Sequence, residues 1–555
     1  MQRIFNQIAS SPSLSAGLLV LLSSFYFIGL GHVHLFDWDE INFAESAREM
    51  IASGDYMKVQ INYMPFWEKP PFFFWLQAAS MHVFGVNEFA ARFPNAVFGI
   101  IYLLSFYWIG RRHISAQFGL LWALLFFGTI LPHLYFKSGI IDPVFNYFIF
   151  ISVYFMMRAL DKSGKSSDML FAGIFSGLSV LTKGPVGFLL LGLTSFVFLA
   201  LQGFKGFPSI KRILIFIAGL AGIVISWLSI EFYQNGTENM MRFLRYMIEL
   251  FNSGVAGHEQ PFYYHFIVVF LGCFPISVIG LPYLLRKGEE SPMLFHRWMQ
   301  VLFWVVMIVF SITTTKIVHY SSLSYTPLSF LGALFVYGLM NKKEVFKKYQ
   351  MVLLVFLASL WSLIFIALPL IMCYRESIYY LINDPFAVAS MKESSTWTGM
   401  ESMIGVLFLS LVTYGLIQFW KKQYLNGVIG FVKATSIVLI LVLFIYLPKI
   451  ESFSQGPAIE FFKQYAEEDA YFETFAYKSY AKYFYARQKY GSNPQRTDIN
   501  WLLKGDIDKP VYFVSKVTNN ELEEFDDISF LGQKGGFRFY KRMPVAREDS
   551  TVVEE

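Results

Sequence analysis

Charged residues are scarce in this sequence. Asp, Glu, Lys and Arg make up 15% of its 555 residues, whereas 55% are hydrophobic and 61 are Phe. A soluble protein carries about 25% charged residues, and charge of that kind is missing here before residue 450. A large cytosolic enzyme is therefore disfavoured, and the many long apolar runs predict a polytopic membrane protein.

Cysteine and nucleotide-binding motifs are also nearly or wholly missing. Cys273 and Cys373 lie at or beside apolar runs, so there is no disulfide framework and no cysteine-based metal site. No glycine-rich phosphate loop or nucleotide-binding pattern is present, which argues against a nucleotide as substrate. We expect no metal ligands, no obligatory cofactor and no nucleic-acid partner.

The apolar runs predict about thirteen membrane-spanning helices. The run from 168 to 203 counts as two because Lys183-Gly184-Pro185 interrupts it with a charge and a helix breaker. The first run lacks a cleavage site, so we interpret it as an uncleaved span rather than a signal peptide. The predicted spans lie near 15–35, 95–112, 116–133, 140–158, 168–182, 186–203, 210–231, 263–285, 298–315, 319–340, 350–372, 402–420 and 428–448.

Basic residues recur in alternate loops between these spans, as in Arg111-Arg112 and Lys421-Lys422. The positive-inside rule then places the N-terminus and the basic loops in the cytoplasm. An odd number of spans places the C-terminus outside. We expect a multi-pass membrane protein with its N-terminus in the cytoplasm and its C-terminus outside.

Three outer segments, 37–93, 232–262 and 374–400, are long or polar, and the chain changes composition after residue 450. Alternating β-branched and aromatic residues predict strands at 510–516 and 536–542, and the region 458–488 has a helical pattern. We predict a transmembrane domain, 1–449, and a small outer α/β domain, 450–555.

The first outer segment holds the densest group of motifs. Asp37-Trp38-Asp39-Glu40 follows the first span, an amphipathic stretch at 44–50 predicts an interfacial helix, and Glu68-Lys69-Pro70-Pro71 forms a turn. Acidic groups near a membrane surface are costly unless paired or used. The alternative is that the acidic cluster only caps and solubilises a loop.

Together with the stretch 84–94, these motifs resemble the bacterial aminoarabinose transferases that modify lipid A, which are related to the protein O-mannosyltransferases. The motif match covers residues 15 to about 340. The resemblance implies an all-α GT-C membrane fold of about thirteen helices, with interfacial helices in the first outer loop and a C-terminal α/β domain. It implies inverting transfer of a sugar from a polyprenyl phosphate to lipid A, another glycan or a protein.

The resemblance also implies roles for individual residues. Asp39 matches the catalytic aspartate, a general base for a hydroxyl acceptor or an orienting group for a phosphate acceptor. Lys69 matches the lysine that binds the donor phosphate. Glu40 is grouped with the catalytic acids, Glu68 is as plausibly structural as functional, and Asp142, before Pro143, completes the site from the second outer loop.

Other cations and supporting residues are predicted with alternatives. Lys183 either binds phosphate or extends to the interface, and Lys316 is either a second phosphate cation or an interfacial anchor. His258, in a loop expected to close over the donor, contacts phosphate or sugar or is an ordinary polar residue. Further support is expected from Arg48, Tyr320 and Tyr325.

The sequence also departs from the family. Asn42 stands where relatives that modify lipid A commonly have Arg, and no Arg lies beside His258, so the same donor sugar is not implied. An alternative function is a lipid or solute transporter or flippase, which predicts inverted repeats and charges near the midplane. No repeat is found, and a non-catalytic scaffold leaves the order of Asp39, Lys69 and Asp142 unexplained. We predict a site beneath 37–93 and 232–262, with both Asp residues across from Lys69.

Overall fold

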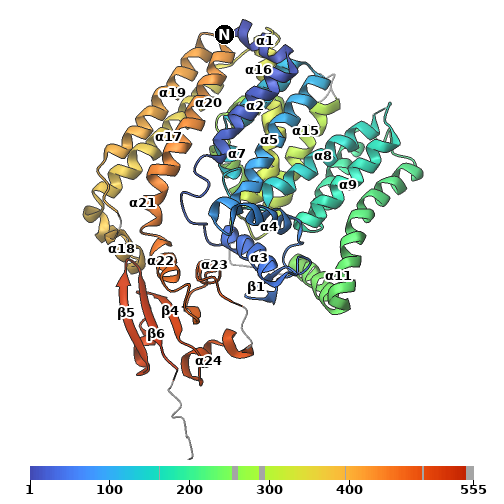
Figure 1. The fold of residues 1–555 in the computed structure, drawn as a ribbon. Helices are drawn as coiled ribbons and strands as arrows, with labels where there is room; N and C mark the ends of the chain where they lie inside the picture. The colour runs from blue at the N-terminus through green and yellow to red at the C-terminus, as the bar shows by residue number, and fades with distance from the viewer. Residues whose placement is uncertain (162, 253–259, 287–293, 394, 490–492, 545–555) are drawn as a thin grey trace, which may run out of the picture.

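A computed structural model describes residues 1–161, 163–252, 260–286, 294–393, 395–489 and 493–544. Most helices form one bundle, and a small sheet domain lies at the end of the bundle opposite the N-terminus (Figure 1). Helices α3 (Asp39–Ser53) and α4 (Phe72–Phe84) and strand β1 (Gln60–Ile61) lie between the two. The N-terminus and the sheet domain therefore lie at opposite ends of the bundle.

Helices coincide with all thirteen predicted spans, but the spans differ in length. Within the described ranges, eight helices are long and apolar enough to cross a membrane, and the bent pair α1–α2 would make a ninth. The other four predicted spans are shorter, interrupted or less apolar; Pro275 and Pro282 break the one near 263–285. The bundle comprises α1 (Gln2–Ser10), α2 (Pro12–Phe27), α5 (Glu88–His113), α6 (Ala116–Phe127), α7 (Ile130–Tyr135), α8 (Asp142–Leu160), α9 (Ser166–Lys183), α10 (Val186–Leu201), α11 (Ile210–Asn252), α12 (Tyr264–Gly272), α13 (Ile276–Ile279), α14 (Leu281–Leu284), α15 (Leu294–Ile312), η2 (Val318–Ser324), α16 (Tyr325–Met340), α17 (Lys348–Cys373), α19 (Met403–Trp420), α20 (Tyr424–Leu441) and α21 (Leu447–Glu451).

The helix predicted at 44–50 is present as part of α3, but it is buried on all sides rather than lying along an open interface. All residues from Glu40 to Met50 are buried. The helix ends at Gly54, whose φ of 73° is the left-handed conformation that glycine adopts readily. Short strands β1 and β2 (Met64–Pro65) pair after it and lead to the Glu68–Pro71 turn.

The second outer segment is more helical than predicted. Helix α11 runs from the expected span through the predicted loop to Asn252, with a break at Gly236, where φ is 75°. In the third outer segment, η3 (Arg375–Leu381) is followed by α18 (Pro385–Lys392), and Phe386 packs edge-on against Phe537 of the sheet.

The C-terminal sheet has the order β3-β4-β6-β5, with β3 and β4 parallel and the other neighbours antiparallel. The strands predicted at 510–516 and 536–542 are confirmed as β4 (Val511–Lys516) and β6 (Phe537–Arg542). The continuous helix at 458–488 is wrong, because β3 (Tyr471–Phe475) separates α22 (Gly456–Gln464) from α23 (Ala481–Phe484). The sheet domain also contains α24 (Ile499–Lys504), β5 (Ile528–Lys534) and the short turns η6 (Pro494–Thr497) and η7 (Glu521–Glu524). The short elements η4 (Met400–Ser402) and η5 (Val442–Tyr446) belong to the bundle. The domain boundary at 449/450 stays a prediction.

Candidate active site

Two acids and a histidine from three distant segments meet where the bundle faces the C-terminal domain. Asp39 begins α3, Asp142 begins α8, and His319 lies in η2. His319 Nε2 lies 3.4 Å from Asp39 Oδ2 and 3.7 Å from Asp142 Oδ2. The imidazole therefore bridges the two carboxylates, which the sequence places about a hundred residues apart.

Lys183, the last residue of α9, completes this group. Its ammonium donates to Asp142 Oδ1 at 2.6 Å and lies 5.1 Å from the centre of the Tyr320 ring. Asp142 Oδ2 is buried and has no hydrogen bond to any residue that the structure describes. Lys183 thus pairs with one oxygen of Asp142, whereas the other oxygen lies 3.7 Å from His319 Nε2 and can still accept a hydrogen bond.

Lys69 lies beside these acids, at the end of the turn after β2. Its ammonium is 3.9 Å from Glu68 Oε2. Burial lowers the pKa of Lys69, and Lys183 adds to the lowering, while Glu68, Asp39 and Asp142 oppose it. Lys69 therefore lies near enough to Asp39, Asp142 and Lys183 for their charges to act on its ammonium.

Glu40 does not point into this group. It forms an ion pair with Arg92, 2.8 Å between Oε2 and Nη2, and accepts the backbone N–H groups of Phe36 and Gly139. Burial alone would raise the pKa of Glu40, but Arg92 and these two donors hold it below its ordinary value. Its placement indicates a structural role, unlike the catalytic one we expected from sequence.

The remaining predicted residues are distributed unevenly. Arg48 is buried beneath the C-terminal domain, where it pairs with Glu45 and donates to the Gln488 carbonyl, away from the acids. Tyr320 lies against Lys183, whereas the Tyr325 hydroxyl is 3.5 Å from that of Tyr135. The Lys316 ammonium donates to the Thr313 carbonyl at 2.5 Å. His258 lies outside the described residues.

His319 is the residue that sequence reasoning missed. It stands in the motif Lys316-Ile317-Val318-His319-Tyr320, for which only the lysine and tyrosine were considered. An ionisable residue at the membrane end of a span is by default a functional candidate. That rule, applied to His319 itself, would have found it.

The sequence Asp37-Trp38-Asp39 has the spacing of a metal-binding Asp-x-Asp pair, but the two carboxylates diverge. Asp37 Oδ1 accepts the backbone N–H of Tyr480 at 3.3 Å, whereas Asp39 faces His319. Burial raises the pKa of Asp37, with Ser479 and Tyr480 opposing the rise. Throughout the described ranges, no three His, Cys, Asp or Glu side chains are grouped so that they could hold a metal ion.

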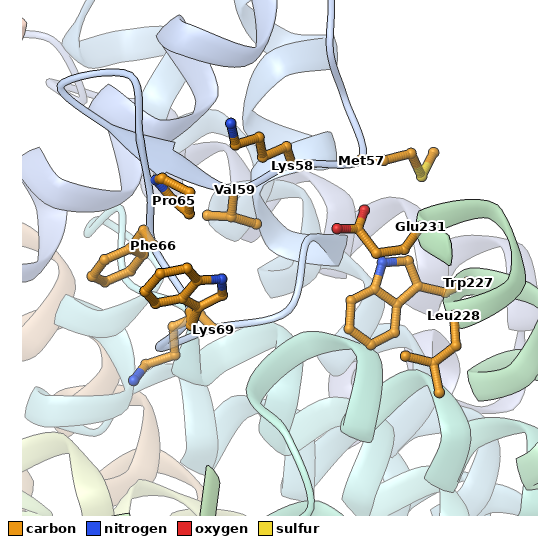
Figure 2. A pocket seen from close by; sticks show the side chains of 10 residues that line it. Met57, Lys58, Val59, Pro65, Phe66, Lys69, Trp227, Leu228 and Glu231 are labelled. Atoms are coloured by element: carbon orange, nitrogen blue, oxygen red, sulfur yellow. The ribbon is translucent and has the colours of Figure 1, made fainter. Parts of the chain in front are cut away.

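A narrow, mostly apolar cleft lies between α11 and Lys69 (Figure 2). Trp227, Leu228 and Glu231 of α11 line one side, and the segments 57–59 and 65–69 line the other. The Lys69 side chain extends away from α11 (Figure 2). Because α11 is one of the candidate membrane spans, this cleft connects a membrane-facing helix to the charged cluster.

Comparison with known proteins relates the chain to glycosyltransferases. The model of the family described as dolichyl-phosphate-mannose-protein mannosyltransferase matches residues 68–230. A protein from Edwardsiella ictaluri named undecaprenyl phosphate-alpha-4-amino-4-deoxy-L-arabinose arabinosyl transferase is 27% identical over 58% of this chain and 58% of its own length. The protein of the same name from Wigglesworthia glossinidia brevipalpis is 24% identical over 60% of each chain. This chain thus spans less than two thirds of both relatives.

The fold agrees over nearly the whole chain. The crystal structure of ArnT from Cupriavidus metallidurans bound to undecaprenyl phosphate has a TM-score of 0.76 at 18% identity, covering 94% of this chain and 97% of that one. The apo structure of the same protein gives 0.75. A transporter is not favoured by any of these matches. The resemblance predicted from the motifs is confirmed: this chain is a multi-pass membrane protein of the GT-C fold and is similar to the aminoarabinosyl transferases.

Proposed function

We propose that this protein is an inverting glycosyltransferase that moves a sugar from a polyprenyl phosphate to an envelope acceptor. The observation that carries the proposal is the convergence of Asp39, Asp142, His319, Lys183 and Lys69. The carboxylates of this group can accept a proton from the acceptor or orient it, and the ammonium groups can stabilise the negative charge of the leaving phosphate. It lies at the inner end of an apolar cleft that begins at a membrane-facing helix.

The reaction requires one bond to form and one to break at the anomeric carbon. An acceptor oxygen attacks from the face opposite the donor phosphate, and the bond from carbon to the phosphate oxygen breaks with inversion. The negative charge that develops on the departing polyprenyl phosphate is stabilised by the Lys69 ammonium. Asp39 accepts the proton of a hydroxyl acceptor; for a phosphate acceptor, which is already ionised, it orients the attacking group.

The cleft between α11 and Lys69 suits the lipid part of the donor. Its walls include Val59, Phe66 and Leu228, so a prenyl chain would bury apolar surface there while its phosphate reached Lys69. The named relatives use undecaprenyl phosphate-linked aminoarabinose, which supports the same donor lipid. Asn42 replaces the commonly expected Arg near Asp39, so the proposal does not extend to the same sugar.

We propose a lipid acceptor of the lipid A type, with other glycans or proteins as the wider class. The enzyme would lie in the bacterial cytoplasmic membrane with its N-terminus inside and the active site and C-terminal domain outside. Loop charge supports this orientation, and so do the opposite positions of the N-terminus and the sheet domain (Figure 1). The proposed chemistry uses no metal ion, because the lysine ammonium groups stabilise the negative charge of the phosphate.

The test is transfer by purified protein in nanodiscs, with undecaprenyl phosphate-linked sugars as donors, phosphorylated glycolipids as acceptors and EDTA present. Asp39→Asn should abolish transfer without changing the melting temperature. Asp498→Asn is the control, because Asp498 caps the Asn500 N–H group at the start of α24 and lines neither the cleft nor the charged group. Full activity of Asp39→Asn, or a strict need for added metal, would refute the mechanism.

A further inference from the structure

The C-terminal domain places an aromatic and cationic surface beside Asp39. The rings of Trp38 and Tyr480 meet edge to face, with centroids 5.2 Å apart at an interplanar angle of 88°. The Lys478 ammonium lies 4.6 Å from the Trp38 ring centre and 5.6 Å from that of Tyr480. The loop that carries Lys478 and Tyr480 is held to the first outer segment by the hydrogen bond from Tyr480 N–H to Asp37.

The group of three side chains, Trp38, Lys478 and Tyr480, is open to solvent at Trp38 and Lys478, while Tyr480 is half-buried. Trp38 is 43% exposed and Lys478 is exposed. By contrast, the neighbouring Lys482 is buried and pairs with Glu473. For Lys478 the structure records no carboxylate within ion-pair distance among the described residues, so its charge is directed at an aromatic surface and solvent.

The group also borders the proposed reaction centre. Trp38 directly precedes Asp39 in the chain. Burial raises the pKa of Tyr480 to about 12, and Glu68, Asp37 and Asp39 add to the rise, so the tyrosine lies within the field of the acids near Lys69. A molecule bound on this surface would therefore lie next to the segment that carries Asp39, on the side of the C-terminal domain.

The chemistry of the three side chains indicates what they bind. Aromatic faces pack against the apolar face of a sugar ring, and their polar atoms remain accessible at its edge. A lysine ammonium without an acidic partner binds phosphate by charge-assisted hydrogen bonds. A phosphorylated sugar satisfies both, whereas a neutral glycan would leave the lysine unused and a free phosphate would leave the rings unused.

We propose that Trp38, Lys478 and Tyr480 form an acceptor subsite that holds a phosphorylated sugar ring, with the ring on the aromatic side chains and the phosphate on Lys478. This proposal rests on the proposed function for its place in the reaction. It gives the C-terminal domain a part in choosing the acceptor, in addition to covering α3.

Binding can test the subsite without any transfer step. The full-length protein in nanodiscs is titrated with lipid A and with enzymatically dephosphorylated lipid A, and affinities are measured by native mass spectrometry. Wild type should prefer the phosphorylated lipid, and Lys478→Met should lose that preference by about tenfold, the loss of one charge-assisted contact. Lys504→Met is the matched control, because Lys504 also lies over an aromatic ring, 5.5 Å from Phe525, on α24.

A second variant examines the aromatic part. Tyr480→Leu should weaken both lipids about equally, because it removes ring contact and leaves the charge, and melting temperatures report whether each variant is folded. Equal binding of both lipids by wild type, or an unchanged preference in Lys478→Met, would overturn the subsite even if transfer is active. Conversely, phosphate-dependent binding that is lost in Lys478→Met, together with no transfer from any prenyl phosphate donor, would support the subsite and refute the proposed function.

Discussion

Replacing Glu40 tests whether this acid is structural or catalytic. Glu40 and Arg92 are both buried and joined by two contacts, 2.8 Å and 3.1 Å. Arg92 also donates to the carbonyls of Leu30, Val33 and His34. The pair therefore links the end of the first span, the start of α3 and α5. In Glu40→Gln, a neutral amide would replace the carboxylate that accepts hydrogen bonds from Arg92 and from the Phe36 and Gly139 N–H groups.

The expected cost is large because one charge would remain buried without its partner. Removing one member of a buried ion pair costs about 3–5 kcal/mol, which corresponds to a fall in melting temperature of roughly 3–4 °C for a chain of 555 residues. The double variant Glu40→Gln/Arg92→Met should cost less than the sum of the single changes, since neither charge is then left alone. Because the pKa of Glu40 is lowered in the fold, its stabilisation should be present above the ordinary carboxyl pKa and be lost as pH falls below it.

The assay compares thermal unfolding and transfer rate for the same nanodisc samples. A structural Glu40 predicts that Glu40→Gln lowers both, whereas Asp39→Asn lowers only the rate. If Glu40→Gln melts with wild type yet transfers nothing, then Glu40 takes part in the chemistry and our interpretation of its ion pair is wrong.

Two further predictions concern buried charges around the site. Burial raises the pKa of Glu49 to about 9, and Glu45 adds to the rise. The fold should therefore lose stability as pH rises from about 4.5 to about 9. Glu49→Gln should reduce this loss, measured as the difference in melting temperature between pH 6 and pH 8.5, and an unchanged difference would contradict the prediction. Lys183→Met should lower kcat at least about tenfold, because Asp142 loses its ion partner. Lys183→Arg keeps the positive charge and should recover part of the rate. An equal loss of rate in both variants would show that Lys183 does not act through its charge.

Much of the fold followed from local patterns. The apolar runs predicted the helices because membrane-spanning segments must be long and continuous, and alternation predicted β4 and β6. Strand β3 was missed because Tyr471–Phe475 lies between two helical stretches, and its strand state depends on parallel pairing with β4. The pairing partner of a strand lies elsewhere in the chain, so the residues 471–475 alone did not indicate it.

The site was predicted less completely than the fold. Asp39, Lys69, Asp142 and Lys183 are brought together, but the motifs gave no indication that His319 bridges the acids. The contribution of Lys478 and Tyr480 also could not be foreseen, because it depends on how the C-terminal domain packs against the first outer segment. Such contacts are decided by tertiary packing, which local composition does not encode.

The adjacent acids Asp39 and Glu40 show how helix geometry separates roles that sequence joins. Successive residues of an α-helix point about 100° apart, so the first two residues of α3 cannot both face His319. Asp39 faces the site and Glu40 faces Arg92. Helix ends favour the charges that are found there, since Asp39 and Asp142 begin α3 and α8 and Lys183 ends α9. Each such placement stabilises the charge by about 0.3–1 kcal/mol. The site is therefore built where helix ends meet, and the acid one residue inside α3 stabilises the fold instead.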